Sequence, residues 1–139
     1  MSNYAKYKDL GNETTESFTP QPKNPLPAQN PGTGGLVISI QNTEHKKQLI
    51  MNNKVVVVDV YADWCMPCKS MASRYEQLAN KYSRQGICCL TKENIDLNIS
   101  QNIQGVPNIQ FFKNGQYITP DITGANVNAI EQRIIELLD

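Results

Sequence analysis

Residues 55–69 have the sequence Val-Val-Val-Val-Asp-Val-Tyr-Ala-Asp-Trp-Cys-Met-Pro-Cys-Lys and form the most informative part of the chain. Residues 55–61 are almost entirely β-branched or aromatic, which predicts a strand buried on both faces at the centre of a sheet. Pro67 is tolerated in the first turn of a helix, because its missing N–H has no partner there in any case. The segment therefore predicts a central strand that leads directly into a helix.

Cys65 and Cys68 form a C-x-x-C pair at the predicted start of this helix. Unpaired backbone N–H groups and the helix dipole favour a thiolate at Cys65, and a thiolate is the species that attacks a disulfide. Cys68 lies one turn further along, so it can expel a substrate from a mixed disulfide. The pair therefore predicts dithiol–disulfide exchange. A zinc half-site is the alternative, but it would need a second C-x-x-C or two histidines, and the chain has one histidine.

Asp59 interrupts the apolar run of the central strand, six residues before Cys65. A buried carboxylate is costly unless it is paired or protonated. Burial should raise its pKa, which makes Asp59 a candidate proton acceptor for the Cys68 thiol, directly or through a water. The alternative is a carboxylate satisfied by a lysine or by a backbone group.

The remaining elements follow from hydrophobic periodicity and turn signals. They are a strand at 36–40, a helix from Thr43 to about Met51, the helix after Pro67 ending before Gly86, a strand at 87–91, a hairpin of 109–113 and 116–119 around Asn114-Gly115, and a last helix with Val127, Ile130, Ile134, Leu137 and Leu138 on its apolar face. Strand–helix–strand units imply parallel pairing, and the closing hairpin adds antiparallel strands. The predicted fold class is α/β, with a central mixed β-sheet flanked by helices on both faces.

Residues 1–34 differ in composition from the rest of the chain. They hold five of the eight prolines, together with many Asn, Gln and Gly residues. Such a stretch has little to bury, so we predict a flexible Pro/Asn/Gln-rich extension, followed by a single domain at 35–139. The alternative is a segment that packs against the domain through Tyr4, Tyr7, Leu10 and Phe18.

The overall composition argues against several classes of partner. The 139 residues include 13 basic and 13 acidic side chains, so no net field attracts nucleic acid or anionic lipid. No run reaches the ~18 apolar residues of a membrane span. No apolar stretch follows the charged residues of the N-terminus, so no secretory signal is predicted and a cytoplasmic location is expected. We expect a monomer.

Cys88 and Cys89 are adjacent residues in a predicted strand. Their side chains should therefore point to opposite faces of the sheet, where a bond between them would be strained. We interpret them as two small buried hydrophobic residues, because free cysteine is commonly buried. A regulatory thiol is the alternative.

The segment from Asp59 to Lys69 resembles the active-site segment of the thioredoxin family, and the resemblance extends from about Leu36 to Asp139. Four further segments match the family in the right order. They are Lys92-Glu-Asn-Ile-Asp96 in the third strand, Gly105-Val106-Pro107 at the cis-proline loop, Phe112-Lys-Asn-Gly115 at the following hairpin, and Gly124-Ala125 at a late substrate-facing glycine.

The resemblance implies a role for each matching residue. Cys65 would be the nucleophile, Cys68 the resolving thiol, Asp59 a buried proton acceptor coupled to Lys92, and Pro107 a cis-proline. The implied substrate-binding surface consists of Trp64, Met66, Pro67, Val106 and Gly124. Disulfide-containing proteins would be the substrates. A separate reductase would supply electrons, because no nucleotide-binding motif such as G-x-G-x-x-G is present and no cofactor or metal is expected.

The sequence departs from the family pattern at several positions. Met66 stands where Gly is usual, Asn108 where Thr is usual after the cis-proline, and Ser73 where a proline often bends the active-site helix. The stretch from Asp96 to Pro107 is shorter than usual, so we expect it to lack part of a helix.

Reduction of protein disulfides is the leading functional hypothesis, because Pro67 before the resolving cysteine resembles the reducing members of the family. A disulfide oxidase or isomerase on the same fold is the second hypothesis. A non-catalytic thioredoxin-like binding module is the third, and the intact C-x-x-C argues against it.

Overall fold

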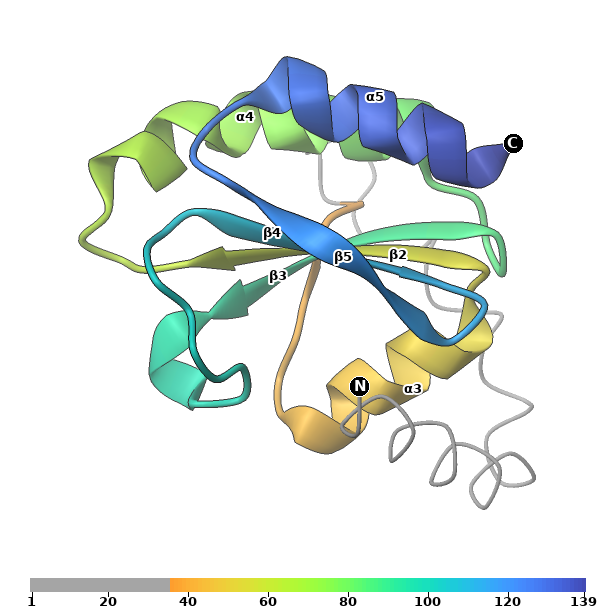
Figure 1. Cartoon of the computed structure of the whole chain (residues 1–139), viewed down its shortest axis with the longest axis horizontal. Coiled ribbons are helices and arrows are strands. Elements are labelled where there is room, and N and C mark those ends of the chain that lie inside the picture. Colours follow the sequence, from red (N-terminus) through yellow and green to blue (C-terminus); the bar gives the residue numbers. More distant parts are fainter. Residues whose placement is uncertain (1–35) are drawn as a thin grey trace.

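The computed structural model describes residues 36–139 (Figure 1). The extension predicted for residues 1–34, and the alternative that it packs on the domain, lie outside the described residues. The described elements are β1 (Ile38–Ser39), α3 (Thr43–Asn52), β2 (Val55–Tyr61), α4 (Met66–Tyr82), β3 (Cys88–Asn94), the 3-10 helix η1 (Ile95–Leu97), β4 (Asn108–Lys113), β5 (Gln116–Thr123) and α5 (Val127–Leu138).

The strands form one mixed sheet in the order β1-β3-β2-β4-β5. β1, β3 and β2 are parallel, whereas β4 and β5 are antiparallel to their neighbours. Helices α4 and α5 cover one face of the sheet and α3 covers the other (Figure 1). The predicted α/β fold, with β2 at the centre of the sheet, is confirmed.

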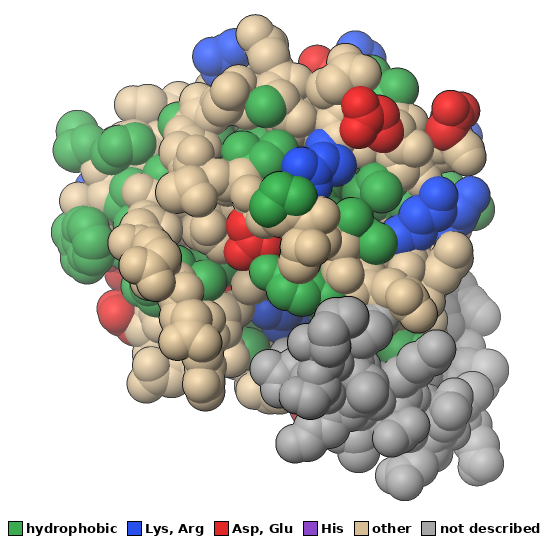
Figure 2. Space-filling view, viewed as in Figure 1, with side chains coloured by type: hydrophobic (Ala, Val, Ile, Leu, Met, Phe, Trp, Pro, Cys, Tyr) green, Lys and Arg blue, Asp and Glu red, His purple; other side chains and the backbone are tan. Residues whose placement is uncertain are grey.

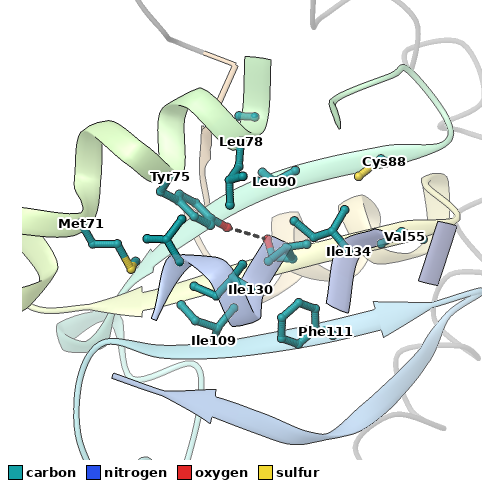
Figure 3. Packing of buried hydrophobic residues seen from close by; sticks show 13 residues of the cluster. Val55, Met71, Tyr75, Leu78, Cys88, Leu90, Ile109, Phe111, Ile130 and Ile134 are labelled. Carbon is teal, nitrogen blue, oxygen red and sulfur yellow. Dashed lines mark hydrogen bonds between the residues drawn. The ribbon is translucent and has the colours of Figure 1, made fainter. Parts of the chain in front are cut away.

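The side chains of β2 alternate between two hydrophobic clusters, one on each face of the sheet. Val55 and Val57 pack with α4 and α5 (Figure 3), whereas Val56, Val58 and Val60 pack on the side of α3. Both faces are buried, which is why this strand needs the continuous valine run rather than an alternating pattern. The same alternation places Asp59 on the face of Val55 and Val57, beneath α4.

The strand ends differ from the sequence-based prediction. β1 contains only two residues of the expected 36–40, and β3 continues to Asn94. β5 continues through Pro120 to Thr123. Pro120 is tolerated because β5 is an edge strand of the sheet. In addition, the pairing of β5 with β4 is irregular between Ile109 and Phe111, so the missing N–H of Pro120 interrupts no regular set of hydrogen bonds.

The connection between β3 and β4 contains only η1 and a loop within the described chain. The expectation that this stretch lacks part of a helix is therefore confirmed. Asn98 and Asn102 adopt positive φ values of 57° and 62° in this connection, a conformation in which Asn is enriched.

Surface charges are mixed on the face drawn in Figure 2, where basic, acidic and hydrophobic side chains are interspersed. None of the described helices has both the length and the hydropathy needed to cross a membrane.

Candidate active site

Cys65 is the N-cap of α4 and Cys68 lies in the helix's first turn, as the sequence predicted. The two cysteines form a disulfide with their Cα atoms 5.3 Å apart. The Cys68 backbone N–H donates a hydrogen bond to Cys65 Sγ at 3.1 Å. An N–H group aimed at this sulfur, at the positive end of a helix, would stabilise a thiolate there once the disulfide is reduced.

The two cysteines are nearly buried, whereas the side chains beside them are open to solvent. Only 3% of Cys65 and 6% of Cys68 is exposed, compared with 70% of Trp64 and 66% of Met66. Pro67 is also exposed and occupies the start of α4. Exposed apolar groups next to a reactive pair form a surface on which another protein can dock.

The loop before β4 approaches the dithiol from a distant part of the chain. Val106 packs against the small cluster of Ala62, Cys65 and Cys68. The Val106–Pro107 peptide bond is cis, as the family resemblance implied. The Gly124 N–H donates to the Pro107 carbonyl at 2.8 Å, which places Gly124 next to the proline.

Gly124 requires its glycine identity for conformational reasons. Its φ is +97°, a conformation that L side chains rarely adopt, although an added Cβ would meet no atom within 4 Å. Of the predicted substrate-binding residues, Val106 contacts the dithiol directly, and Gly124 is hydrogen-bonded to Pro107, the residue that follows Val106. Their roles in binding, like those of Trp64, Met66 and Pro67, stay predictions.

Asp59 is a buried carboxyl with an unsatisfied oxygen. It is 6% exposed, and its Oδ1 has no hydrogen-bond partner. Burial raises its pKa from 3.8 to about 7, and the charge of Lys92 opposes part of that rise. Asp59 and Lys92 are register partners in β2 and β3, so the predicted coupling has a structural basis. A carboxyl with this pKa can gain or lose a proton near neutral pH.

Sequence reasoning missed two neighbours of the dithiol. Tyr61 and Ile95 both pack against the cluster that contains Cys65 and Cys68, and the Lys92 Nζ lies 5.7 Å from the centre of the Tyr61 ring. The period of two along β2 places Tyr61 on the same face as Asp59, so that signal was available. The position of Ile95 depends on where the sheet ends, which the sequence does not specify.

Cys88 and Cys89 lie on opposite faces of the sheet, in the α4–α5 cluster and the α3 cluster respectively. Both are free and buried. Burial raises the pKa of Cys88 to about 11 and that of Cys89 to about 12. The interpretation as two small buried residues is confirmed, and both thiols are held in the protonated, unreactive form.

A parallel strand that delivers two cysteines to the start of a helix, facing a cis-proline loop, defines a thiol–disulfide oxidoreductase. The family model described as Thioredoxin matches residues 36–136. The chain belongs to the thioredoxin family.

Individual relatives agree with this assignment. Thioredoxin-1 of Schizosaccharomyces pombe is 30% identical over 100 residues, which cover 71% of this chain and 96% of that protein. Thioredoxin-like protein 1 of the same organism is 33% identical over 102 residues, which cover 70% of this chain. This chain spans only 34% of that longer relative. The crystal structure of thioredoxin from Malassezia sympodialis superimposes with a TM-score of 0.66 at 30% identity and covers 74% of this chain and 94% of its own.

Proposed function

We propose that this protein reduces disulfide bonds in other proteins through the Cys65–Cys68 dithiol. The Cys65 thiolate attacks one sulfur of the substrate disulfide, and the other substrate sulfur leaves and takes up a proton. Cys68 then loses its proton and attacks Cys65 Sγ in the resulting mixed disulfide. The second substrate sulfur leaves and is protonated, and Cys65 and Cys68 are left as a disulfide. A separate reductase restores the dithiol with two electrons and two protons.

The observation that carries this proposal is the hydrogen bond from the Cys68 N–H to Cys65 Sγ at the start of α4. It singles out Cys65 as the sulfur whose anion is stabilised, and therefore as the attacking thiolate. Cys68 follows one turn later, with its sulfur in bonding reach of Cys65. The order of attack and resolution follows from this asymmetry.

Asp59 is proposed as the group that accepts the proton from Cys68 in the second step. With a pKa of about 7, the carboxylate is present in a substantial fraction of molecules at neutral pH and can still be protonated there. The positive charge of Lys92, its partner in the neighbouring strand, lowers the pKa of Asp59 and so increases the fraction of molecules in which Asp59 is ionised. Transfer occurs directly or through one water.

Cysteine substitutions test the mechanism in an insulin-reduction assay. Cys65→Ser should abolish turnover, and Cys68→Ser should accumulate covalent adducts with insulin that dithiothreitol releases. Cys88→Ser is the matched control, because it removes a buried thiol remote from the helix start and should keep turnover. Full activity in Cys65→Ser would show that the mechanism is wrong.

The direction of electron flow is tested by the reduction potential of the Cys65–Cys68 pair, measured by equilibration with glutathione or dithiothreitol buffers. A value near ~−270 mV, as in thioredoxins, supports reduction, whereas ~−180 mV or higher supports an oxidase or isomerase.

The hypothesis of a non-catalytic binding module is tested with the double variant Cys65→Ser, Cys68→Ser. Unchanged cellular function in that variant would favour binding alone.

We further propose that the protein acts as a monomer in the cytoplasm, on disulfide-containing proteins, and not on nucleic acid or at a membrane surface. The zero formal net charge and the mixed surface of Figure 2 support this choice of partners. Size-exclusion chromatography with light scattering tests the monomer, and imaging of a tagged chain tests the location.

A further inference from the structure

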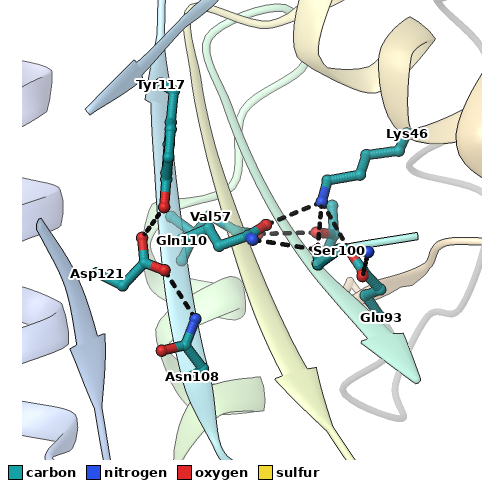
Figure 4. A network of polar contacts seen from close by, with 9 residues as sticks. Lys46, Val57, Glu93, Ser100, Asn108, Gln110, Tyr117 and Asp121 are labelled. Carbon is teal, nitrogen blue, oxygen red and sulfur yellow. Dashed lines mark hydrogen bonds and ion pairs between the residues drawn. The ribbon is translucent and has the colours of Figure 1, made fainter. Parts of the chain in front are cut away.

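A buried polar network lies on the face of the sheet opposite to Asp59 (Figure 4). The Lys46 Nζ, from α3, donates to Glu93 Oε1 at 2.7 Å, to Gln110 Oε1 at 2.8 Å and to Ser100 Oγ at 3.0 Å. Lys46 is 2% exposed and Glu93 is fully buried. These side chains lie beside the apolar cluster that fills this face.

Stability alone does not account for charged residues at these positions. Taking a lysine and a glutamate out of water costs several kcal/mol, and replacing such a pair with well-packed apolar residues is often neutral or stabilising. Neighbouring positions of the same face are filled by Val58 and Phe112, so apolar packing is available there.

All of its members converge on Ser100, in the loop that follows η1. Glu93 Oε2 accepts from the Ser100 backbone N–H at 3.0 Å, and Gln110 Nε2 donates to Ser100 Oγ at 3.1 Å. Within the described chain, every hydrogen bond made by residues 99–106 involves Ser100. The loop has no helix of its own in the described structure, so these bonds are its polar attachment to the sheet.

The same loop ends at the dithiol. Val106 packs against Cys65 and Cys68, and the residue after Pro107 is anchored as well. Asn108 donates to Asp121 Oδ2 at 2.8 Å and its Oδ1 accepts from the Thr123 hydroxyl at 3.3 Å. Hydrogen bonds made by the buried side chains of Glu93, Gln110 and Asn108 therefore hold the chain on both sides of the Val106–Pro107 bond.

We propose that Lys46, Glu93 and Gln110 are positioning residues that hold the Val106–Pro107 loop at the distance from the dithiol that a protein substrate requires. They touch no reacting atom and act through Ser100. This inference rests on the proposed function, because it concerns the docking of a substrate segment on that loop. A disulfide too small to contact the loop should not depend on the network.

The test compares two substrates in the variant K46M/E93L, which replaces the ion pair with apolar side chains of similar volume. We expect the KM for insulin to rise about tenfold while kcat changes little, because the loop is displaced but the sulfurs are not. The rate with the small disulfide 5,5′-dithiobis(2-nitrobenzoate) should stay within about twofold of the wild type, because that reaction depends on thiolate character and access. Ser100→Ala should shift the insulin KM in the same direction by a smaller factor, and it keeps the ion pair if the double variant does not fold.

The matched control is K81M/E131L, which removes an exposed ion pair, 2.9 Å long, between α4 and α5. It should alter neither substrate's kinetics. NMR order parameters of the backbone amides of residues 101–106 give a second readout that needs no activity, and these order parameters should be lower in K46M/E93L and in Ser100→Ala than in the wild type.

Unchanged order parameters in a folded variant, or an equal loss of rate with both substrates, would overturn the positioning role. If the wild type itself reduces neither substrate, the proposed function fails, and the order parameters still decide whether the network anchors the loop.

Discussion

Replacing Asp59 with asparagine removes a titrating group from the interior and leaves a neutral side chain of nearly the same shape. In the folded protein the pKa of Asp59 is about 7, compared with 3.8 for an ordinary aspartate. The folded state therefore holds this proton over a pH range in which the unfolded chain has lost it. Stability falls as the pH rises wherever the folded state binds more protons. The unfolding free energy of the wild type should thus fall between about pH 4 and pH 7 relative to that of Asp59→Asn. The gap, which is the unfolding free energy of Asp59→Asn minus that of the wild type, should be constant at higher pH.

The two pKa values give the size of this effect. A difference of about three pKa units corresponds to about 4 kcal/mol, because each unit is worth about 1.36 kcal/mol. Roughly 3 kcal/mol of this should appear between pH 5 and pH 8, a range in which most proteins remain soluble and folded. The burial of the asparagine amide adds an offset that does not depend on pH, so the change in the gap, and not its absolute value, is the prediction.

Urea unfolding of the oxidised protein, followed by far-UV circular dichroism at a series of pH values, measures this gap. The disulfide form is used because the Cys65 and Cys68 thiols then do not titrate. Asp63→Asn is the matched control, because it makes the same substitution at an exposed carboxylate two residues before Cys65. If the unfolding free energy of Asp59→Asn minus that of the wild type stays constant or falls from about pH 4 to pH 9, the assignment of a desolvated carboxyl is refuted.

Three further predictions concern the surroundings of the dithiol. Gly124→Ala should lower the free energy of unfolding, measured by urea denaturation, by about 1–2 kcal/mol because of the positive φ at this position. Gly105→Ala is the control, because an added Cβ also meets no atom there but φ is not in the positive range, so it should be close to neutral. Equal losses of unfolding free energy at both sites would contradict the conformational explanation. Trp64→Ala should change stability by no more than about 0.5 kcal/mol but raise the KM for insulin severalfold, and an unchanged KM would remove Trp64 from the docking surface. In the reduced native protein, Ellman's reagent should react rapidly with the active-site dithiol and convert it to the Cys65–Cys68 disulfide. Cys88 and Cys89 should react only after unfolding, because they are buried with raised pKa values. Rapid reaction of all the cysteines would contradict this placement of Cys88 and Cys89.

The part of the site that sequence reasoning predicted is encoded locally. The valine run specifies a strand buried on both faces, and the C-x-x-C with Pro67 specifies where α4 begins, because each signal depends only on residues within a few positions. The burial of Asp59 followed from its place inside that run. The same holds for Cys88 and Cys89, whose opposite orientations follow from the period of two along β3.

The network around Ser100 was not predictable in this way. Gln110 lies between two apolar residues of its strand, a pattern that also fits a solvent-exposed face. Glu93 lies between Lys92 and Asn94, which suggests an exposed strand end and not a buried position. Lys46 lies 47 residues from Glu93 and 64 residues from Gln110, and α3 gives no sequence signal that its lysine points inward. The contact of Lys46 with Glu93 and Gln110 depends on α3 packing on the sheet face opposite to α4. It also depends on the strand order β3-β2-β4, which brings Glu93 and Gln110 to either side of β2.

The two faces of β2 are therefore expected to contribute to the same reaction in different ways. On the side of α4, Asp59 and its strand partner Lys92 are proposed to control the proton transfer from Cys68, so a change there should appear in the pH dependence of turnover. On the side of α3, Lys46 and Glu93 hold the loop that a protein substrate must contact, and a change there should appear in KM for large substrates. Because β2 separates the two sets and shares no hydrogen-bonded side chain with the network, Asp59→Asn and K46M/E93L should act independently, and their effects on insulin reduction should add as free energies within about 0.5 kcal/mol. A coupling larger than this would mean that the loop position also alters the environment of Asp59.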